Sequence, residues 1–412
     1  MYRRWTIRCF FLAATIAAGV PAECAADREF IYVESNIQSP NGNSIFAFQR
    51  SADGTLSQVV GSPFLTQGAG VQDTTIEFGP YDTDQNIVID KNRRLLYAVN
   101  SGSDTIAAFH VNSDGTLTPV SGSPFPAGGE AGGTNPVSLG LSGDILFVVD
   151  QSGDPGRPST VLPLYTAFHI ESDGSLTPIA GSTVSVAFRT SPSQALTIPD
   201  KKLLFGADFL GGLLQAFQFD SEGHLNQRPP TPLPASEFVN DPSPRAVLGL
   251  ITHPQLPLLY VGMPTVSRLG VFRFDKHGRL TFVRSVPNSG IAICWLRTNR
   301  AGTRLYTTNQ GSFTSTSTIS VYDITDPETP KEIQSITPSG ISNATQIELS
   351  LDEQNLFVVS QHFNTITPPN QGKALHVFSI GADGTLKEDV APITLDVPEG
   401  AQPQGIAVIG ES

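Results

Sequence analysis

The residues that could do chemistry in this chain are few and widely spaced. Among its seven histidines and three cysteines, none falls in an HExxH, CxxC or GxSxG pattern, and no Walker loop is present. His362 lies in a long polar segment and could act as an acid or base, although a solvated loop histidine without a task is the simpler interpretation. Cys294 stands next to Trp295 and is expected to pack in the interior, because a catalytic thiol needs a nearby base.

Charged side chains give two further hypotheses. Four acids gather in one segment: Asp73, Glu77, Asp82 and Asp84. They could bind a cation, but their spacing fits no calcium loop, so a solvated acidic loop is expected. Arg157 and Arg268 stand in or beside long polar segments and could bind an anion, although an ordinary surface charge is the simpler interpretation for each.

The first 26 residues have the three-part layout of a secretory signal peptide. Arg3, Arg4 and Arg8 precede an apolar run from residue 9 to residue 20, and small residues around Ala26 follow. The apolar run is too short to span a bilayer. We therefore expect cleavage after Ala26 and a periplasmic or secreted protein that consists of residues 27–412.

The mature chain would be acidic. Loss of three arginines and one glutamate with residues 1–26 moves the formal net charge from −13 to −15. This charge argues against nucleic acid or an anionic membrane as a partner. Cys294 would be the one cysteine left, so we expect no disulfide within the chain and a fold held by apolar burial. We expect a monomer without a cofactor or metal.

These residues depend on a repeated framework for their positions. The phrase SDGTLTPVSGSPF at 113–125 has near copies at 52–64 and 172–183. Around it, residues 87–125 divide into four short apolar runs, IVID, LLYAVN, TIAAFHV and TLTPV, separated by polar turns. Asp114 and Gly115 are expected to supply the positive φ angles of a tight hairpin turn. Pro119 fits an outermost strand.

The hairpin turn recurs seven times. It falls at residues 53–54, 114–115, 173–174, 222–223, 277–278, 325–330 and 383–384. Intervals of about fifty to sixty residues are typical of four-stranded propeller blades. The first repeat begins at EFIYVES and lacks its innermost strand, which QGIAVIG at 404–410 would supply. The sequence therefore predicts an all-β, seven-bladed β-propeller with four antiparallel strands per blade, closed by its C-terminal strand.

The long loops are predicted to lie on one face. In a propeller, the connections between blades and those between the second and third strands leave on the same side. Insertions occur there at 65–86, 150–163, 234–246, 308–318 and 360–373. The turns of the opposite face are short. Long loops gathered on one side favour a binding face, and neutral drift of surface loops is the alternative.

The sequence resembles the seven-bladed lactonase family, which includes bacterial 6-phosphogluconolactonase and fungal carboxymuconate cyclase. The resemblance rests on the DGTL…GSPF phrases and on GIAICWLRTNRAGTRLYTTNQGS…STISVY at 290–322, and it extends over nearly the whole mature chain. It implies hydrolysis or cyclisation of a small anionic lactone, with a His, a Glu and one or two Arg at the central mouth, near the starts of the inner strands. Such chemistry needs an acid or base within hydrogen-bond reach and donors for the developing oxyanion.

The corresponding positions of this chain carry other residue types. Ser193, beside Gln194, stands where family members often have His, Gln346 stands at the acidic position, and Arg245 is the nearest match for an anion-binding Arg. The resemblance makes Arg245 a candidate catalytic residue, and His362, the one histidine expected on the long-loop face, is the candidate that could substitute for the missing acid or base. The candidate substrate-binding residues are Gln194, Arg268, Gln346 and Gln404.

Two functions stay open at this point. The first is a lactonase-type enzyme that acts on a small anionic lactone at the central channel mouth. The second is a non-catalytic propeller that binds a protein, a peptide or a small ligand through the long loops of one face. The replaced acid and base positions favour the second, and the family resemblance favours the first.

Overall fold

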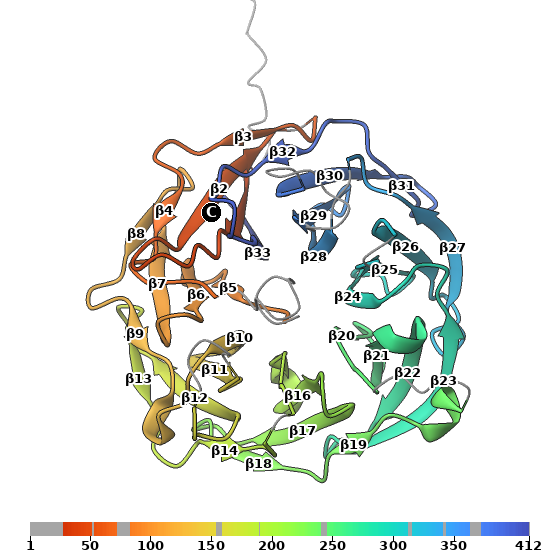
Figure 1. Cartoon of the computed structure of the whole chain (residues 1–412), viewed down its shortest axis with the longest axis horizontal. Helices are drawn as coiled ribbons and strands as arrows, with labels where there is room; N and C mark the ends of the chain where they lie inside the picture. The colour runs from red at the N-terminus through yellow and green to blue at the C-terminus, as the bar shows by residue number, and fades with distance from the viewer. Residues whose placement is uncertain are drawn as a thin grey trace, which may run out of the picture.

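Seven β-sheets are arranged as a ring around a central axis in the computed structural model (Figure 1). The structure describes residues 28–51, 53–71, 83–153, 159–188, 190–239, 245–311, 315–340, 343–362 and 372–411. Short 3-10 turns are found at Gly129–Ala131, Pro199–Lys201, Ala235–Phe238 and Pro264–Val266. The predicted seven-bladed propeller is confirmed. The cleavage site expected after Ala26 lies outside the described residues.

Blades 1 to 4 each run from an innermost to an outermost strand. Blade 1 contains β33 (Gln404–Gly410), β1 (Glu29–Glu34), β2 (Ser44–Arg50), β3 (Leu56–Gln58) and β4 (Phe64–Leu65). Blade 2 contains β5 (Ile87–Asp90), β6 (Leu95–Asn100), β7 (Thr105–Val111), β8 (Leu117–Pro119) and β9 (Phe125–Pro126). Blade 3 contains β10 (Pro136–Ser142), β11 (Ile145–Asp150), β12 (Leu164–Ile170), β13 (Leu176–Pro178) and β14 (Val184–Ser185). Blade 4 contains β15 (Leu196–Ile198), β16 (Leu203–Asp208), β17 (Leu213–Phe219), β18 (Leu225–Gln227) and β19 (Thr231–Pro232).

Blades 5 to 7 continue the ring in the same order. Blade 5 contains β20 (Leu250–Thr252), β21 (Leu258–Met263), β22 (Arg268–Phe274) and β23 (Leu280–Pro287). Blade 6 contains β24 (Ile293–Thr298), β25 (Arg304–Asn309), β26 (Thr318–Asp323) and β27 (Lys331–Ile336). Blade 7 contains β28 (Asn343–Leu349), β29 (Asn355–Gln361), β30 (Ala374–Ile380), β31 (Leu386–Lys387) and β32 (Ile393–Thr394).

The C-terminal strand closes the ring as predicted. β33 pairs antiparallel with β1, and Ala407 lies opposite Tyr32 in the register. Apolar side chains then interlock between neighbouring blades: Phe30 and Ala407 of blade 1 share one buried cluster with Leu96 of blade 2. Burial between blades, rather than a single central core, therefore holds the ring together.

The repeated Asp-Gly turn has a physical explanation that differs in part from the expected one. Gly115 has a φ of 81°, whereas Asp114 is not among the residues with positive φ, so the expectation was wrong for the aspartate. Its carboxylate instead accepts hydrogen bonds from the backbone N–H of Thr116 at 3.0 Å and from the Thr116 hydroxyl at 2.6 Å. An Asp that binds the backbone two residues ahead is a standard way to fix a turn.

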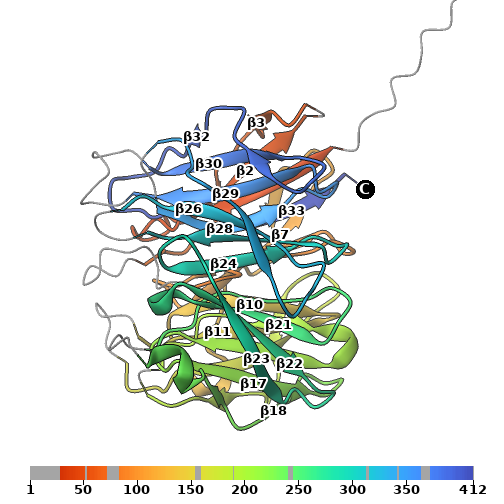
Figure 2. The same ribbon diagram turned by 90° about the vertical axis from the view of Figure 1, so that its right-hand side faces the viewer.

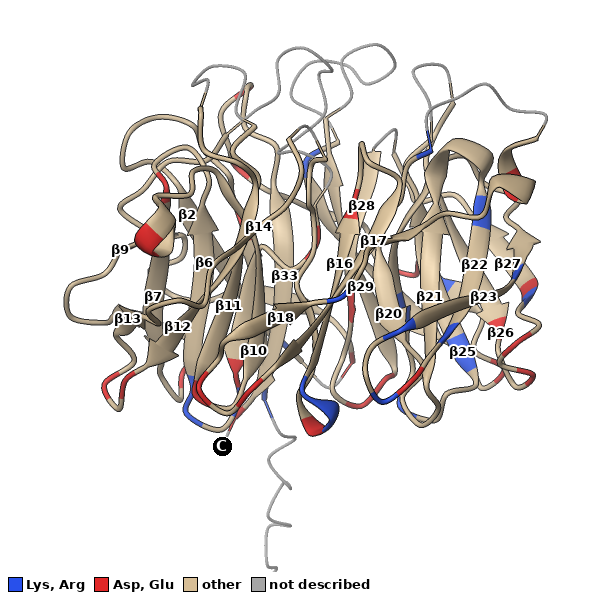
Figure 3. Cartoon of the chain, turned by 90° about the horizontal axis from the view of Figure 1, so that it is seen from below, with Lys and Arg blue, Asp and Glu red and all other residues tan. Residues whose placement is uncertain are grey.

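The two faces of the ring differ in charge. The inner strands begin at the long-loop face and end at the opposite, short-loop face (Figure 2). There Glu411 N donates to the backbone oxygen of Arg28, the first described residue. Charged residues of the described chain are more frequent toward the short-loop face (Figure 3). None of the described helical segments is long and apolar enough to cross a membrane.

Candidate functional site

A short segment before β5 fills the long-loop end of the central channel. We call residues 83–86 the central segment. The carbonyl oxygen of Thr83 accepts hydrogen bonds from Trp295 Nε1 at 2.8 Å, Gln346 Nε2 at 2.7 Å and Gln404 Nε2 at 2.7 Å. These donors come from blades 6, 7 and 1, and Thr83 is fully buried. Three blades thus hold one backbone carbonyl at the middle of the ring.

The second residue of the central segment forms a buried ion pair. Asp84 is fully buried, and its two carboxylate oxygens lie 3.1 and 3.3 Å from Arg297 Nη1 and Nη2. Arg297 Nε also donates to Glu348 Oε2 at 3.1 Å. Burial alone would lower the pKa of Arg297, but the two neighbouring carboxylates outweigh it and raise the pKa. One cation is therefore shared by two anions, which leaves this group with one net negative charge.

The acidic loop expected from the sequence is only partly testable. For Asp84 the expectation of a solvated carboxylate was wrong, because the side chain is buried against Arg297. The other acids of that segment, Asp73, Glu77 and Asp82, and also Arg157, lie outside the described residues. Among the described residues, no group of three or more His, Cys, Asp or Glu side chains is placed to bind a metal ion.

The three candidate glutamines do meet at the channel, but they contact the chain itself. Gln194 Oε1 accepts from Leu250 N at 2.7 Å and Gln194 Nε2 donates to Leu250 O at 3.0 Å, which joins blade 4 to blade 5. The same Nε2 lies 3.3 Å from Asp84 Oδ2. Gln346 and Gln404 donate to Thr83, as described above. All three therefore position the central segment.

The candidate arginines lie elsewhere on the long-loop side. The Arg245 guanidinium is 5.6 Å from the ring centre of Phe238, and the residue is exposed. Arg268, at the start of a third strand, has Nε 2.9 Å from Glu237 Oε2, and its Nη2 donates to Ser285 O at 3.1 Å. The described contacts of both side chains are thus with their own blades and linkers, away from the central segment.

The structure buries both Cys294 and His362, although only Cys294 was expected in the interior. Cys294 is buried and clusters with Leu248 and Trp295, as expected. His362 is only 6% exposed, and its backbone N–H donates to Gln402 Oε1 at 3.1 Å, so a solvated loop histidine was the wrong expectation.

A cavity lies on the short-loop side of the central segment. Its volume is about 420 Å³. Gln85, Gln194 and Arg297 line its inner end, and the exposed Lys91, which follows β5, lies at its mouth. The rest of the lining comes from the inner strands: Ile87, Val88, Ile89, Leu141, Leu196, Thr197, Ile251, Thr298, Glu348, Ile406, Ala407 and Val408. The cavity is within the size range of small-molecule sites.

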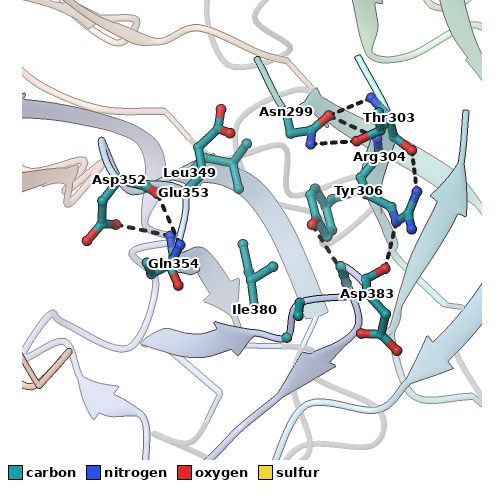
Figure 4. A pocket seen from close by; sticks show the side chains of 13 residues that line it. Asn299, Thr303, Arg304, Tyr306, Leu349, Asp352, Glu353, Gln354, Ile380 and Asp383 are labelled. Atoms are coloured by element: carbon teal, nitrogen blue, oxygen red, sulfur yellow. Dashed lines mark hydrogen bonds between the residues drawn. The ribbon is translucent and has the colours of Figure 1, made fainter. Parts of the chain in front are cut away.

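A second cavity, of about 450 Å³, lies between blades 6 and 7 (Figure 4). Tyr306 crosses it and donates from its hydroxyl to Gly384 O at 3.2 Å, and Arg304 Nε donates to Asp383 O at 2.7 Å. The tyrosine contact is repeated around the ring, with Tyr32 bound to Gly115 O and Tyr97 bound to Gly174 O, both at 2.9 Å. Because the same contact joins other neighbouring blades, we attribute this cavity to the way in which neighbouring blades pack.

Sequence reasoning missed Arg297 and Glu348. Both stand in inner strands, in CWLRT and QIELS, where a charge interrupts an otherwise apolar or neutral run. A charge on an inner strand is costly to bury unless it is paired. That rule could have marked both residues, although it could not have named Asp84 as the shared partner.

Comparison with known proteins agrees with this architecture. Residues 258–406 match the family described as "Lactonase, 7-bladed beta-propeller". This match confirms the resemblance to that family stated from the sequence. No curated protein matches the chain.

Solved structures share the whole ring. A protein of Bacteroides fragilis, provisionally assigned as a 6-phosphogluconolactonase, is 16% identical, with a TM-score of 0.69 over 95% of this chain and 100% of its own. The periplasmic gluconolactonase of Pseudomonas aeruginosa is 15% identical, with a TM-score of 0.65 over 92% of this chain and 99% of its own. Identities this low show a common fold.

Proposed function

We propose that this lactonase-type propeller binds a small molecule in its central cavity and does not hydrolyse lactones at its long-loop mouth. The observation that supports this most directly is the central segment. Where the family resemblance implies a His and an acidic residue, this chain has Ser193 and Gln346, whose side chains donate hydrogen bonds to Ala207 O and Thr83 O of the chain itself. An amide side chain exchanges no proton near neutral pH, so it cannot replace a general acid or base.

The binding site that remains is the cavity on the short-loop side. It is lined by the inner strands of all seven blades, and its inner end is polar. Concave sites of this size with a few fixed polar groups are typical of ligand-binding proteins. The channel therefore supports ligand binding from the face opposite to the long loops.

Hydrolysis inside this cavity is the second candidate function. Glu348 is the one acid among the lining residues, and Arg297 Nε lies 3.1 Å from its carboxylate. A carboxylate beside a guanidinium could activate water next to a bound ester or lactone. The names of the Bacteroides and Pseudomonas proteins also suggest this chemistry for a propeller of this shape.

The experiment uses the mature protein, residues 27–412, and a panel of gluconolactone, phosphogluconolactone, muconolactone and acyl-homoserine lactones. We expect no turnover above background and, by saturation-transfer NMR, binding of at least one member of the panel. Thr197→Phe fills the cavity and should abolish that binding, while Thr177→Phe, on the exposed edge of blade 3, should preserve it.

Two outcomes would count against the proposal. Turnover that is lost in Glu348→Gln would establish the hydrolase instead, and Arg245→Ala in parallel would show whether the long-loop mouth contributes. Equal binding by the Thr197→Phe variant and the unaltered protein would place the ligand outside the cavity.

We also propose export, on the basis of the charged and apolar N-terminal residues. Expression of the full chain followed by N-terminal sequencing of the periplasmic and secreted fractions tests this. A mature protein that begins near residue 27 is the expected result, and an uncleaved cytoplasmic chain would contradict it.

A further inference from the structure

The walls of the central cavity are aliphatic. Isoleucine, leucine, valine and alanine residues of the inner strands make up nine of its sixteen described lining residues, and none of the sixteen is aromatic. Sugar rings are commonly held by stacking on aromatic faces, which this cavity does not offer. Aliphatic walls gain most from a flexible apolar body, because transfer from water scales with apolar area.

The inner end of the cavity offers one fixed amide donor. Gln85 Oε1 accepts from Gln194 Nε2 at 3.1 Å, while Gln85 Nε2 has no partner among the described residues. The backbone around it is held: Gln85 N donates to Asp84 Oδ1 at 2.8 Å and Leu139 N donates to Gln85 O at 2.9 Å. An N–H₂ group that is fixed in place and lines a cavity is suited to bind a carbonyl oxygen.

The charge at the inner end opposes an anionic ligand. Arg297 carries the positive charge, and both Asp84 and Glu348 pair with it. The group as a whole keeps one negative charge, and like charges in a partly dry site repel strongly. Lys91 lies at the mouth, so it does not offset this charge at the inner end.

We infer that the central cavity takes an uncharged molecule with an aliphatic body and a carbonyl head, such as a lactone, ester or amide, with the head at Gln85. This inference rests on the proposed function, since it names the ligand class of the same cavity. It differs from the small anionic lactone that the family resemblance implies.

The test compares two molecules with the same carbon chain. δ-Decalactone is uncharged, and its ring-opened form, 5-hydroxydecanoate, carries a carboxylate. Calorimetric titration of the mature protein at neutral pH should show binding of the lactone and about tenfold weaker binding, or none, of the hydroxy acid. Glucose, which lacks the aliphatic body, should not bind. Equal or tighter binding of the hydroxy acid or of glucose would overturn the inference.

Two variants test the residues that carry the argument. Gln85→Asn withdraws the amide by one methylene and suits the left-handed backbone at this position, where φ is 65°, so the fold should persist. It should weaken lactone binding about tenfold. Glu348→Gln removes one negative charge and should narrow the difference between lactone and hydroxy acid, whereas Glu171→Gln, an exposed control, should not.

The two levels of the proposal fail in different ways. If Thr197→Phe abolishes binding but the lactone and the hydroxy acid bind equally well, the cavity is the site and the ligand class is wrong. If Thr197→Phe leaves lactone binding unchanged, the proposed function is wrong as well.

Discussion

The last residue of the second strand is an asparagine in some blades and an aspartate in others. Asn100 Oδ1 accepts hydrogen bonds from Asn43 and Thr66, and Asn309 Nδ2 donates to Thr318 and Ser320. Asp150 ends the equivalent strand of blade 3, is fully buried, and has no hydrogen-bond partner for either carboxylate oxygen among the described residues. Burial, and then the nearby charge of Asp104, raise the pKa of Asp150 from 3.8 to about 8. The position suits an amide better than an ionised acid.

The first prediction concerns the variant Asp150→Asn. Because the pKa is higher in the folded state than in the unfolded state, the folded state holds a proton that the unfolded state loses as the pH rises from about 4 to about 8. The free energy of unfolding of the unaltered protein should therefore fall over this range. The variant should flatten that dependence and gain on the order of 5 kcal/mol at pH 8. Denaturant unfolding at several pH values measures this.

Asp208→Asn is the matched control. Asp208 ends the second strand of blade 4, but Gln215 Nε2 donates to it at 3.1 Å, and burial raises its pKa only to about 6. Its replacement should change the pH dependence less and over a lower range. A larger effect at Asp208 than at Asp150 would contradict this account.

At the scale of elements, a repeated serine divides the outer edge of blades 1, 2 and 3. The sequence predicts one outer strand in blade 2, but β8 and β9 share that edge because Ser123 Oγ accepts the backbone N–H of Ala108 at 2.9 Å. Ser62 does the same for Ala47 at 2.8 Å in blade 1. A side-chain oxygen replaces the missing backbone acceptor, which explains why the phrase GSPF recurs.

The second prediction is that Ser123→Ala destabilises the protein by about 1 kcal/mol, because the N–H of Ala108 loses its acceptor. Chemical denaturation measures the difference. Ser121→Ala, two residues away and exposed, should leave stability within about 0.5 kcal/mol of the unaltered protein. Equal effects of the two substitutions would show that the Ser123 hydroxyl does not support the edge.

At the scale of the molecule, stability depends on closure of the ring. β33 lies inside blade 1 and pairs with β1 over its whole length, so the last strand of the chain is the inner wall of the first blade. Gln404, at its start, also donates to Thr83 in the central segment. Closure and filling of the channel are therefore linked through one strand.

The third prediction is that a chain ending at residue 403 does not form the native ring. It loses the inner strand of blade 1 and exposes the edge of β1, which favours aggregation. Size-exclusion chromatography and near-ultraviolet circular dichroism should show association and loss of tertiary signal. A chain ending at Glu411 is the control and should remain monomeric. A folded monomer from the shorter chain would show that closure is dispensable.

Local sequence patterns were sufficient for most of the fold. β5, β6 and β7 coincide with the predicted runs, and all seven hairpin turns lie where the sequence placed them. These features are set by alternation and turn residues within a few positions of one another. The first repeat lacks its innermost strand and the C-terminal segment has one strand too many, so the pairing of β33 with β1 could also be deduced from the sequence.

The arrangement inside the channel was decided by the tertiary structure. The glutamines at 194, 346 and 404 were correctly placed at the channel, but what they bind is a backbone segment between 100 and 330 residues away. Asp84 likewise could not be paired with Arg297 from the sequence, because 213 residues separate them. Partners so distant meet only when seven blades close, and that closure also forms the cavity on the short-loop side, because all seven inner strands line it.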